Sequence, residues 1–303
     1  MAIYLGIDGG GTKTTCAVGD EHLVLGTATS GGSNVTRVGN ARAREALHAT
    51  VREACALAKI DPAQIKSACV GLSGAGRAEV RDAVARMMAE VIGGRVQVIS
   101  DLETTLEAGF GGGPGVITIA GTGSIAFGRD ARGKTARSGG WGWAISDEGS
   151  GQWVGRRAVS AVLGAKDAGE DPPLLETILS LWKLTTLDEL VRSANAWPPP
   201  DFSGLFPSVL ATAKAGERLP LGVLNEAGIE LAGLARNVIR RLFAGVGNVP
   251  VAMSGGVFRQ SEVVREVFYN AVIAEFPQAS VHPEVVEAVQ GALALARKAS
   301  ASA

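Results

Sequence analysis

The first twenty residues constrain the fold more than any other stretch of the chain. Residues 3–7 form a short apolar run that ends on Asp8, three glycines follow, and residues 15–18 favour a second strand. This pattern predicts a β-hairpin whose tip carries one carboxylate and the hydroxyls of Thr12 and Thr14. Backbone N–H groups at such a tip can surround a phosphate, and a carboxylate beside them can hold Mg²⁺. The alternative is an ordinary glycine-rich hairpin that binds nothing.

The two common phosphate-binding motifs do not fit this hairpin. A Walker A loop needs lysine directly after its last glycine and then a helix, whereas Thr12 stands at that position and a strand follows. A Rossmann fingerprint also needs a helix after its glycines. A phosphate site at this turn would therefore belong to a different nucleotide-binding fold.

A glycine turn of the same kind recurs in the second half of the chain. Residues 7–12, IDGGGT, correspond to residues 119–124, IAGTGS, and a strand pattern stands on both sides of each string. This correspondence indicates an internal duplication. Ala120 replaces Asp8 in the second copy, and two phosphate turns that share one nucleotide need only one metal carboxylate.

The rest of the chain alternates strands with helices, which predicts mixed sheets with helices on their faces. The expected strands are 23–28, 65–72, 96–99, 116–120, 125–129, 134–138 and 250–253, and the main expected helices are 41–59, 79–92, 102–109, 152–163, 221–244, 261–276 and 285–298. Residues 171–216 are expected to form a helical insertion. In the last helix, Gly291 among alanines predicts the close approach of another helix, at a hinge.

The glycine-rich run at 111–115 is the clearest break in the chain, and a hinge is expected there. We therefore expect an N-terminal domain of residues 1–113 plus 285–303 and a C-terminal domain of residues 114–284 that contains the insertion. The length of 303 residues suffices for two domains with separate cores.

Composition excludes several classes of protein. Hydrophobic residues make up 46% of the chain, too many for a disordered protein, and the net charge of −1 argues against a nucleic-acid binder. No apolar run is long enough to span a membrane, and the N-terminus lacks the features of a signal peptide. Three cysteines without paired spacing suit a reducing compartment, so we expect a cytoplasmic protein without membrane contact.

Four loops sit at strand ends and carry glycines or a carboxylate: residues 8–12, Asp101, residues 121–124 and residues 254–257. Their order resembles the sugar-kinase, actin and heat-shock-chaperone superfamily, over nearly the whole chain. The resemblance implies an α/β fold of two RNase-H-like, actin-like ATPase domains, with mixed sheets flanked by helices and an interdomain cleft.

Five strings are similar to the N-acetylglucosamine-kinase branch of that superfamily, which includes ATPases of the BadF/BadG type. They are GIDGGGTK at 6–13, GTGS at 121–124, GGWG at 139–142, SDEGS at 146–150 and SGGV at 254–257. This resemblance implies a homodimeric, ATP- and Mg²⁺-dependent kinase acting on the 6-hydroxyl of an amino sugar, first of all N-acetylglucosamine. The alternatives are a glucosamine or N-acetylmuramic acid kinase, or an activator-type ATPase.

The resemblance also implies a role for each matching residue. Asp101 would be the general base, although it could instead be a plain helix N-cap, a role that Ser100 can also fill. Asp8 would hold Mg²⁺. The nucleotide would contact Gly10, Gly11, Thr12, Lys13, Thr122, Gly123, Ser124, Gly255 and Gly256, and the sugar would contact Asn34, Ser73, Asp101, Gly140, Asp147 and Glu148.

Some of these assignments have simpler alternatives. Lys13 could be a solvated hairpin charge and Asp147 a solvated loop acid, while Trp141 and Trp143 could be core residues or a sugar platform. Some N-acetylglucosamine kinases have asparagine where this chain has Ile125, so the preference for an acetylated, free or muramic sugar stays open.

The activator-type function needs cysteines that hold an iron–sulfur cluster between subunits. Cys16 and Cys69 fall in predicted strands and Cys55 in a predicted helix, so no loop offers a pair of ligands. A sugar-sensing repressor of the same fold would need a helix-turn-helix module, and the hairpin already begins at residue 3.

Overall fold

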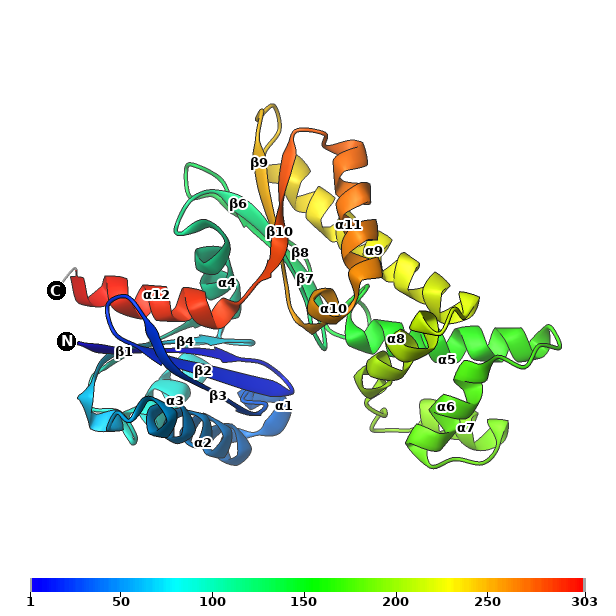
Figure 1. Ribbon diagram of the computed structural model, residues 1–303, viewed down its shortest axis with the longest axis horizontal. Helices are drawn as coiled ribbons and strands as arrows, with labels where there is room; N and C mark the ends of the chain where they lie inside the picture. Colours follow the sequence, from blue (N-terminus) through cyan, green and yellow to red (C-terminus); the bar gives the residue numbers. More distant parts are fainter. Residues whose placement is uncertain (1, 302–303) are drawn as a thin grey trace. The chain divides into compact units, whose positions relative to one another are not determined.

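The computed structural model describes residues 2–301, which form two compact units. Unit 1 comprises the described residues up to Ile117 and from Val286 onward, and unit 2 comprises Thr118–Val285. Each unit is built around one five-stranded sheet flanked by helices (Figure 1). The predicted α/β class with two mixed sheets is confirmed.

Unit 1 contains five strands, which are β1 (Ile3–Gly9), β2 (Lys13–Gly19), β3 (Val24–Gly31), β4 (Ile65–Leu72) and β5 (Arg95–Ser100). Its helices are α1 (Val35–Val38), α2 (Asn40–Ala58), α3 (Ala78–Ala89), α4 (Asp101–Phe110) and α12 (Ala288–Ala301), with a short 3₁₀ helix at Pro62–Gln64. The strand order is β3-β2-β1-β4-β5. The first three strands form an antiparallel meander that begins with the predicted hairpin, and β1, β4 and β5 run parallel.

The parallel strands bring three chain segments to one edge of the sheet. Gly9 of β1 lies beside Leu72 of β4, and Leu72 lies beside Ser100 of β5. The loops that follow these strands therefore start close together, which is the usual place for a ligand site in such sheets.

Alternating side chains give unit 1 a core on each face of its sheet. Leu5 and Ile7 point to the face covered by α2 and α3, whereas Tyr4 points to the face covered by α12 (Figure 1). Close backbone contact holds α12 in place, because a side chain on Gly6 would overlap the backbone of Leu293. The sequence period of two in β1 thus accounts for two separate apolar layers.

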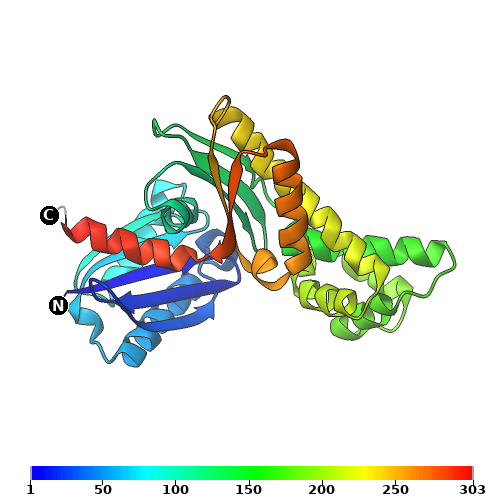
Figure 2. The same ribbon diagram turned by 45° about the horizontal axis from the view of Figure 1, so that its top comes forward.

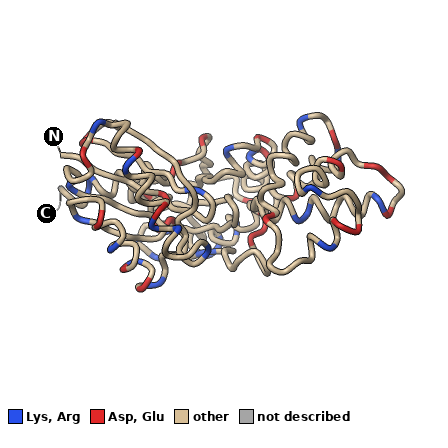
Figure 3. The backbone as a smooth tube through the Cα atoms, turned by 90° about the horizontal axis from the view of Figure 1, so that it is seen from below, with Lys and Arg blue, Asp and Glu red and all other residues tan. Residues whose placement is uncertain are grey.

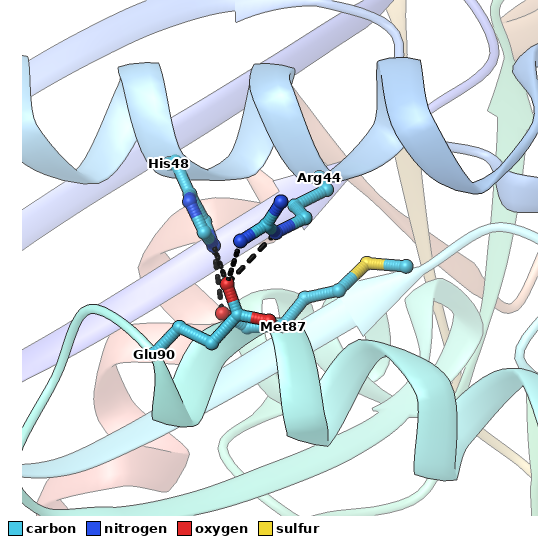
Figure 4. Close-up of polar contacts among 4 residues, drawn as sticks. All are labelled: Arg44, His48, Met87 and Glu90. Carbon is cyan, nitrogen blue, oxygen red and sulfur yellow. Dashed lines mark hydrogen bonds and ion pairs between the residues drawn. The ribbon is translucent and has the colours of Figure 1, made fainter.

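A polar cluster joins α2 to α3 on one face of unit 1 (Figure 4). The buried ring of His48 donates from Nε2 to the Met87 carbonyl oxygen, 2.7 Å away. Glu90 accepts hydrogen bonds from the Arg44 guanidinium, and its carboxylate lies 3.8 Å from His48 Nε2. These contacts fix how α3 lies on α2.

Unit 2 repeats the strand order of unit 1. Its strands are β6 (Gly115–Ala120), which starts before the unit boundary, β7 (Ser124–Arg129), β8 (Thr135–Gly139), β9 (Val249–Ser254) and β10 (Ala279–Val286). The order β8-β7-β6-β9-β10 matches β3-β2-β1-β4-β5 strand for strand. The duplication predicted from the two glycine strings therefore extends to the whole sheet.

The helices of unit 2 are α5 (Gly151–Asp167), α6 (Pro173–Trp182), α7 (Leu187–Ala194), α8 (Phe206–Lys214), α9 (Arg218–Leu242), α10 (Gly256–Gln260) and α11 (Glu262–Glu275), with a 3₁₀ helix at Phe202–Leu205. Helices α9 and α11 pack side by side, and α9 covers β7 and β8 (Figure 2). The expected insertion is helical, as α6, α7 and α8.

Strand β10 corrects one prediction. The sequence pattern predicts that the last helix begins at residue 285, but residues 279–286 form an edge strand and α12 begins at Ala288. Pro283 and the polar residues around it hide this strand, because proline interrupts a strand pattern and is tolerated only at a sheet edge. The short helix α10 begins inside the segment 254–257, which was predicted as a loop, and no element was predicted for α1.

Charges of both signs are interspersed along both units (Figure 3). In the part of the chain that the structure describes, no helix combines the length and the apolar content needed to cross a bilayer.

Candidate functional site

The glycine turn of unit 1 is held by backbone hydrogen bonds. Gly10 N–H donates to the Lys13 carbonyl oxygen at 2.9 Å and closes the turn. The Gly10 carbonyl oxygen accepts from the backbone N–H groups of Ser33 and Asn34, at 3.0 and 3.1 Å. A side chain on Gly32 would overlap the turn itself. The segment after β3 therefore buttresses the turn and fixes its shape.

Three predicted polar residues accompany this turn. Asp8 is half-buried at the end of β1, whereas Thr12 and Lys13 are exposed at the tip. Among the described residues, no group of three or more His, Cys, Asp or Glu side chains could hold a metal ion. A metal at Asp8 would take its remaining ligands from phosphate and water, which is how Mg²⁺ usually binds.

Asp101 is the first residue of α4, directly after β5. Its Oδ1 accepts hydrogen bonds from Ser100 Oγ at 3.2 Å and from Leu102 N–H at 3.1 Å. Ser100 is the N-cap of α4 and also accepts from Leu102 N–H, at 3.3 Å. Because Ser100 caps α4, the helix does not depend on the Asp101 carboxyl for its N-cap.

Burial raises the pKa of Asp101, and hydrogen bonds from Ser100, Leu102 and Ser73 partly oppose that rise. Desolvation makes a carboxylate a stronger proton acceptor, because the charged form loses its water. A base whose pKa moves toward the working pH is a more efficient proton acceptor in catalysis. Asp101 therefore combines a raised pKa with a position at the carboxyl end of β5.

Two predicted sugar contacts lie on neighbouring loops. Ser73 N–H donates to the Gly9 carbonyl oxygen at 2.9 Å, which ties the loop after β4 to the first hairpin. Asn34 Oδ1 caps α1 by accepting from Thr36 N–H at 3.1 Å, and the Asn34 amide lies beside Gly74. The predicted site residues of unit 1 therefore lie at the carboxyl ends of β1, β4 and β5 and just after β3. They are Asp8, Gly10, Gly11, Thr12, Lys13, Asn34, Ser73 and Asp101.

The second glycine turn is fastened to the start of α5. Gly121 N–H donates to the Gly123 carbonyl oxygen at 2.9 Å within the turn. Gly151 N–H then donates to the Gly121 carbonyl oxygen at 2.8 Å, and Gln152 N–H donates to that of Thr122 at 3.3 Å. The turn in unit 2 has a different buttress from the one in unit 1.

Asp147 lies against this second turn rather than in solvent. Its Oδ1 accepts from Ser124 N–H at 3.3 Å, and a Cβ atom on Gly123 would lie 2.9 Å from its Oδ2. Burial raises the pKa of Asp147, which also has the strained φ of 66°. Ser124 Oγ donates to the Glu148 carbonyl oxygen at 2.6 Å, and the Glu148 carboxylate accepts from Ser146 Oγ at 3.0 Å.

Residues 140–143, which follow β8, carry the predicted sugar contact Gly140 and two tryptophans. A Cβ atom on Gly140 would lie 2.6 Å from Ile125 Cδ1, so Gly140 packs directly on that side chain. Trp141 is 65% exposed and Trp143 is 39% exposed, which excludes the core role considered for this pair. The Arg137 guanidinium stacks on Trp141, 3.9 Å from the ring centre.

The predicted adenosine loop lies next to the second turn. Gly255 has a φ of 98°, and a side chain there would overlap the carbonyl oxygen of Ala120 at the end of β6. Gly256 is the first residue of α10. Unit 2 therefore brings Thr122, Gly123, Ser124, Asp147, Glu148 and Gly255 together, with Gly140 on Ile125 nearby.

Two residues near these loops belong to no motif that predicts them from the sequence. Arg37 packs on Gly11 of the first turn, and Thr104 of α4 lies against Gly71 of β4. An arginine three residues after the predicted sugar contact Asn34 was the only local signal for Arg37.

All three cysteines are buried, in the strands and the helix predicted for them. Burial raises the pKa of Cys55 to about 11 and that of Cys69 to about 12, and it raises the pKa of Cys16 as well. Such thiols are poor metal ligands, because a ligand must be the thiolate. This arrangement disfavours an iron–sulfur cluster shared between subunits.

The repeated sheet, with a glycine turn after the first strand of each copy, defines the fold shared by actin-like ATPases and sugar kinases. Comparison with known families agrees with this class. The chain belongs to the BadF/BadG/BcrA/BcrD ATPase family, whose model matches residues 5–296.

Similar proteins span nearly the full chain. An N-acetylmuramic acid/N-acetylglucosamine kinase from Clostridium acetobutylicum is 28% identical and covers 98% of this chain and 99% of its own length. An N-acetyl-D-glucosamine kinase from Dictyostelium discoideum is 29% identical, with 97% of each chain covered. A solved structure from Chromobacterium violaceum, described as a candidate N-acetylglucosamine kinase, superposes with a TM-score of 0.75 at 27% identity and covers 97% of this chain and 99% of its own.

Proposed function

We propose that this protein is an ATP-dependent kinase that phosphorylates the 6-hydroxyl of an amino sugar, with N-acetylglucosamine as its acceptor. The observation that carries the proposal is the position of Asp101, a carboxyl with a raised pKa at the sheet edge that also presents the first glycine turn. The names of the full-length relatives support the same activity.

Asp101 acts as the general base. It accepts the proton of the 6-hydroxyl as that oxygen forms a bond to the γ-phosphorus and the bond to the leaving ADP oxygen breaks. A positioned base contributes roughly 10²- to 10⁴-fold in rate. The Ser100 and Leu102 hydrogen bonds to Oδ1 orient the carboxylate before the sugar arrives.

The two glycine turns bind the nucleotide. ATP supplies the phosphoryl group, and Asp8 would hold Mg²⁺, which would neutralise charge on the phosphates. Gly10, Gly11, Thr12 and Lys13 contact phosphate from unit 1, and Thr122, Gly123 and Ser124 contact phosphate from unit 2. A Cβ atom on Gly123 would meet the Asp147 carboxylate, so glycine is needed where the second turn packs on Asp147. Gly255 and Gly256 contact adenosine, and Gly255 itself packs on the Ala120 carbonyl oxygen of β6.

Asn34, Ser73, Gly140, Asp147 and Glu148 bind the sugar together with Asp101. Hydroxyl-rich ligands need such fixed acceptors and donors, because an unpaired buried polar group costs about 1–3 kcal/mol. Ile125 beside Gly140 supplies an apolar surface where asparagine would supply an amide. N-acetylmuramic acid and glucosamine are therefore the acceptors to compare with N-acetylglucosamine.

The activity test is ADP release measured across a set of sugars. We expect turnover with N-acetylglucosamine and little turnover with glucose or with no sugar. ATP turnover that is indifferent to every sugar would contradict the proposal and favour an activator-type ATPase. Asp101→Asn should abolish transfer with nucleotide binding retained, whereas Glu103→Gln, an exposed acid on the same helix, should behave as wild type.

Three further expectations belong to this proposal. The protein works in the cytoplasm, it forms a homodimer, and its functional domains are residues 1–113 plus 285–303 and residues 114–284. Light scattering of the purified protein tests the dimer, and limited proteolysis near residues 111–115 tests the hinge expected there.

A further inference from the structure

Arg37 lies on the first glycine turn. A Cβ atom on Gly11 would be 3.0 Å from Arg37 Nη1 and 3.1 Å from Arg37 Cδ. The guanidinium and the end of its aliphatic stem thus cover the glycine at the tip of the hairpin. Any group that approaches Gly11 on that side meets this cation.

The backbone fixes Arg37 in this position. Arg37 N–H donates to the Asn34 carbonyl oxygen at 2.9 Å and faces the Asn34 side-chain oxygen at 3.3 Å. Asn34 itself is bonded through its N–H to the Gly10 carbonyl oxygen at 3.1 Å. Arg37 is therefore connected to the turn through Asn34 by backbone hydrogen bonds.

The charge of Arg37 is not neutralised by the protein. Within residues 2–301, Arg37 forms no ion pair with a carboxylate, and its side chain is exposed. Arg44 of the same unit is also exposed, but it is paired with Glu90. An unpaired guanidinium held over a glycine turn is suited to an anion, because its planar fork matches phosphate oxygens.

We propose that Arg37 binds the phosphate chain of the nucleotide at the first glycine turn. This inference rests on the proposed kinase function. It adds to the nucleotide site an arginine that lies outside the glycine-rich strings. Its contact with Gly11, rather than with Ser73 or Asp101, favours a nucleotide phosphate over an acidic group of the sugar. Arg37 binds and orients phosphate and takes no proton.

The test compares Arg37→Met with Arg42→Met. Arg42 is an exposed arginine at the start of α2, so its replacement removes the same charge without touching the turn. Affinity for ADP and for a non-hydrolysable ATP analogue with Mg²⁺ is measured by calorimetry in the absence of sugar. We expect Arg37→Met to weaken nucleotide binding by about tenfold to a hundredfold, the effect of losing charge-assisted hydrogen bonds, and Arg42→Met to leave it unchanged.

A conservative variant separates binding from structure. Arg37→Lys keeps the charge but not the fork, so it should recover part of the lost affinity. Thermal unfolding of each variant shows whether the fold is intact, and if Arg37→Met unfolds, the same comparison is made with Arg37→Lys and Arg42→Lys.

Two results would overturn the inference. Equal nucleotide affinity in the Arg37 and Arg42 variants would remove Arg37 from the phosphate site. A loss confined to the KM of N-acetylmuramic acid would place the anion on the sugar instead. Because binding is measured without sugar, a wild-type protein that binds nucleotide but phosphorylates no sugar would end the proposed function without deciding the role of Arg37.

Discussion

Gly291 of α12 lies directly against the carbonyl oxygen of Thr104 in α4, so closely that any Cβ atom would overlap that oxygen and lie 2.7 Å from Ala108 N. Two helix backbones therefore cross with no side chain between them. The crossing lies next to Asp101, which begins α4, so the packing of α12 helps to place the proposed base.

Gly291→Ala should destabilise unit 1 by about 1–3 kcal/mol or more, because an overpacked backbone contact must open. Gly222→Ala is the matched control, since Gly222 lies in α9 with open space around its missing side chain. That control should be neutral or stabilising by about 0.5–1 kcal/mol. Urea unfolding measures both variants, and a Gly291→Ala protein as stable as wild type would show that the two helices can separate freely.

The raised pKa of Asp101 predicts the acid side of the pH profile. Asp101 must be ionised to accept a proton, so kcat/KM should fall as the pH drops through its pKa. That fall should come at a pH above the ordinary aspartate value of about 3.9. A profile that stays flat down to pH 4 would separate Asp101 from the chemistry.

The same shift has a consequence for stability. A carboxyl whose pKa is higher in the folded than in the unfolded protein lowers the free energy of unfolding once it is ionised. This loss of stability is absent in acid, where the carboxyl is protonated in both states, and appears as the pH rises. Asp101→Asn should therefore be at least as stable as wild type at neutral pH, with no advantage below the ordinary pKa. Thermal unfolding at both pH values checks this expectation.

Asp147 is expected to affect both substrates. Because its carboxylate accepts from Ser124 N–H on the second turn, Asp147→Asn should raise the KM for ATP as well as the KM for the sugar. A residue that touched only sugar would change only the sugar KM. Glu170→Gln, an exposed acid beyond α5, serves as the control, and steady-state kinetics with each substrate varied in turn make the distinction.

The three thiols should be unreactive in the folded protein. Their pKa values are raised by burial, to about 11 for Cys55 and about 12 for Cys69, so little thiolate exists at pH 8. Titration with a disulfide reagent should label them slowly in the native state and completely in urea. Rapid labelling of one native cysteine would reopen the activator-type alternative.

The sequence alone determined the two glycine turns, the position of Asp101 after a strand, and the repeat between the halves. These features are local: glycines after an apolar run specify a tight turn, and strand and helix periods report which residues face a core. For the same reason the first hairpin of unit 1 could be predicted, and so could the placement of Cys16 and Cys69 in strands and of Cys55 in a helix.

Only the tertiary structure decided which residues meet. The edge strand β10 alternates apolar and polar residues from Ala279 to Val285, but Pro283 interrupts this pattern, and proline is tolerated in a strand only at an edge. The contacts of Arg37 with Gly11, Asp147 with Gly123, and Gly291 with Thr104 join residues whose spacing in the chain encodes no partner. The period of apolar residues predicts which face of a helix or strand is buried. Which residues contact that face depends on the packing of the whole unit.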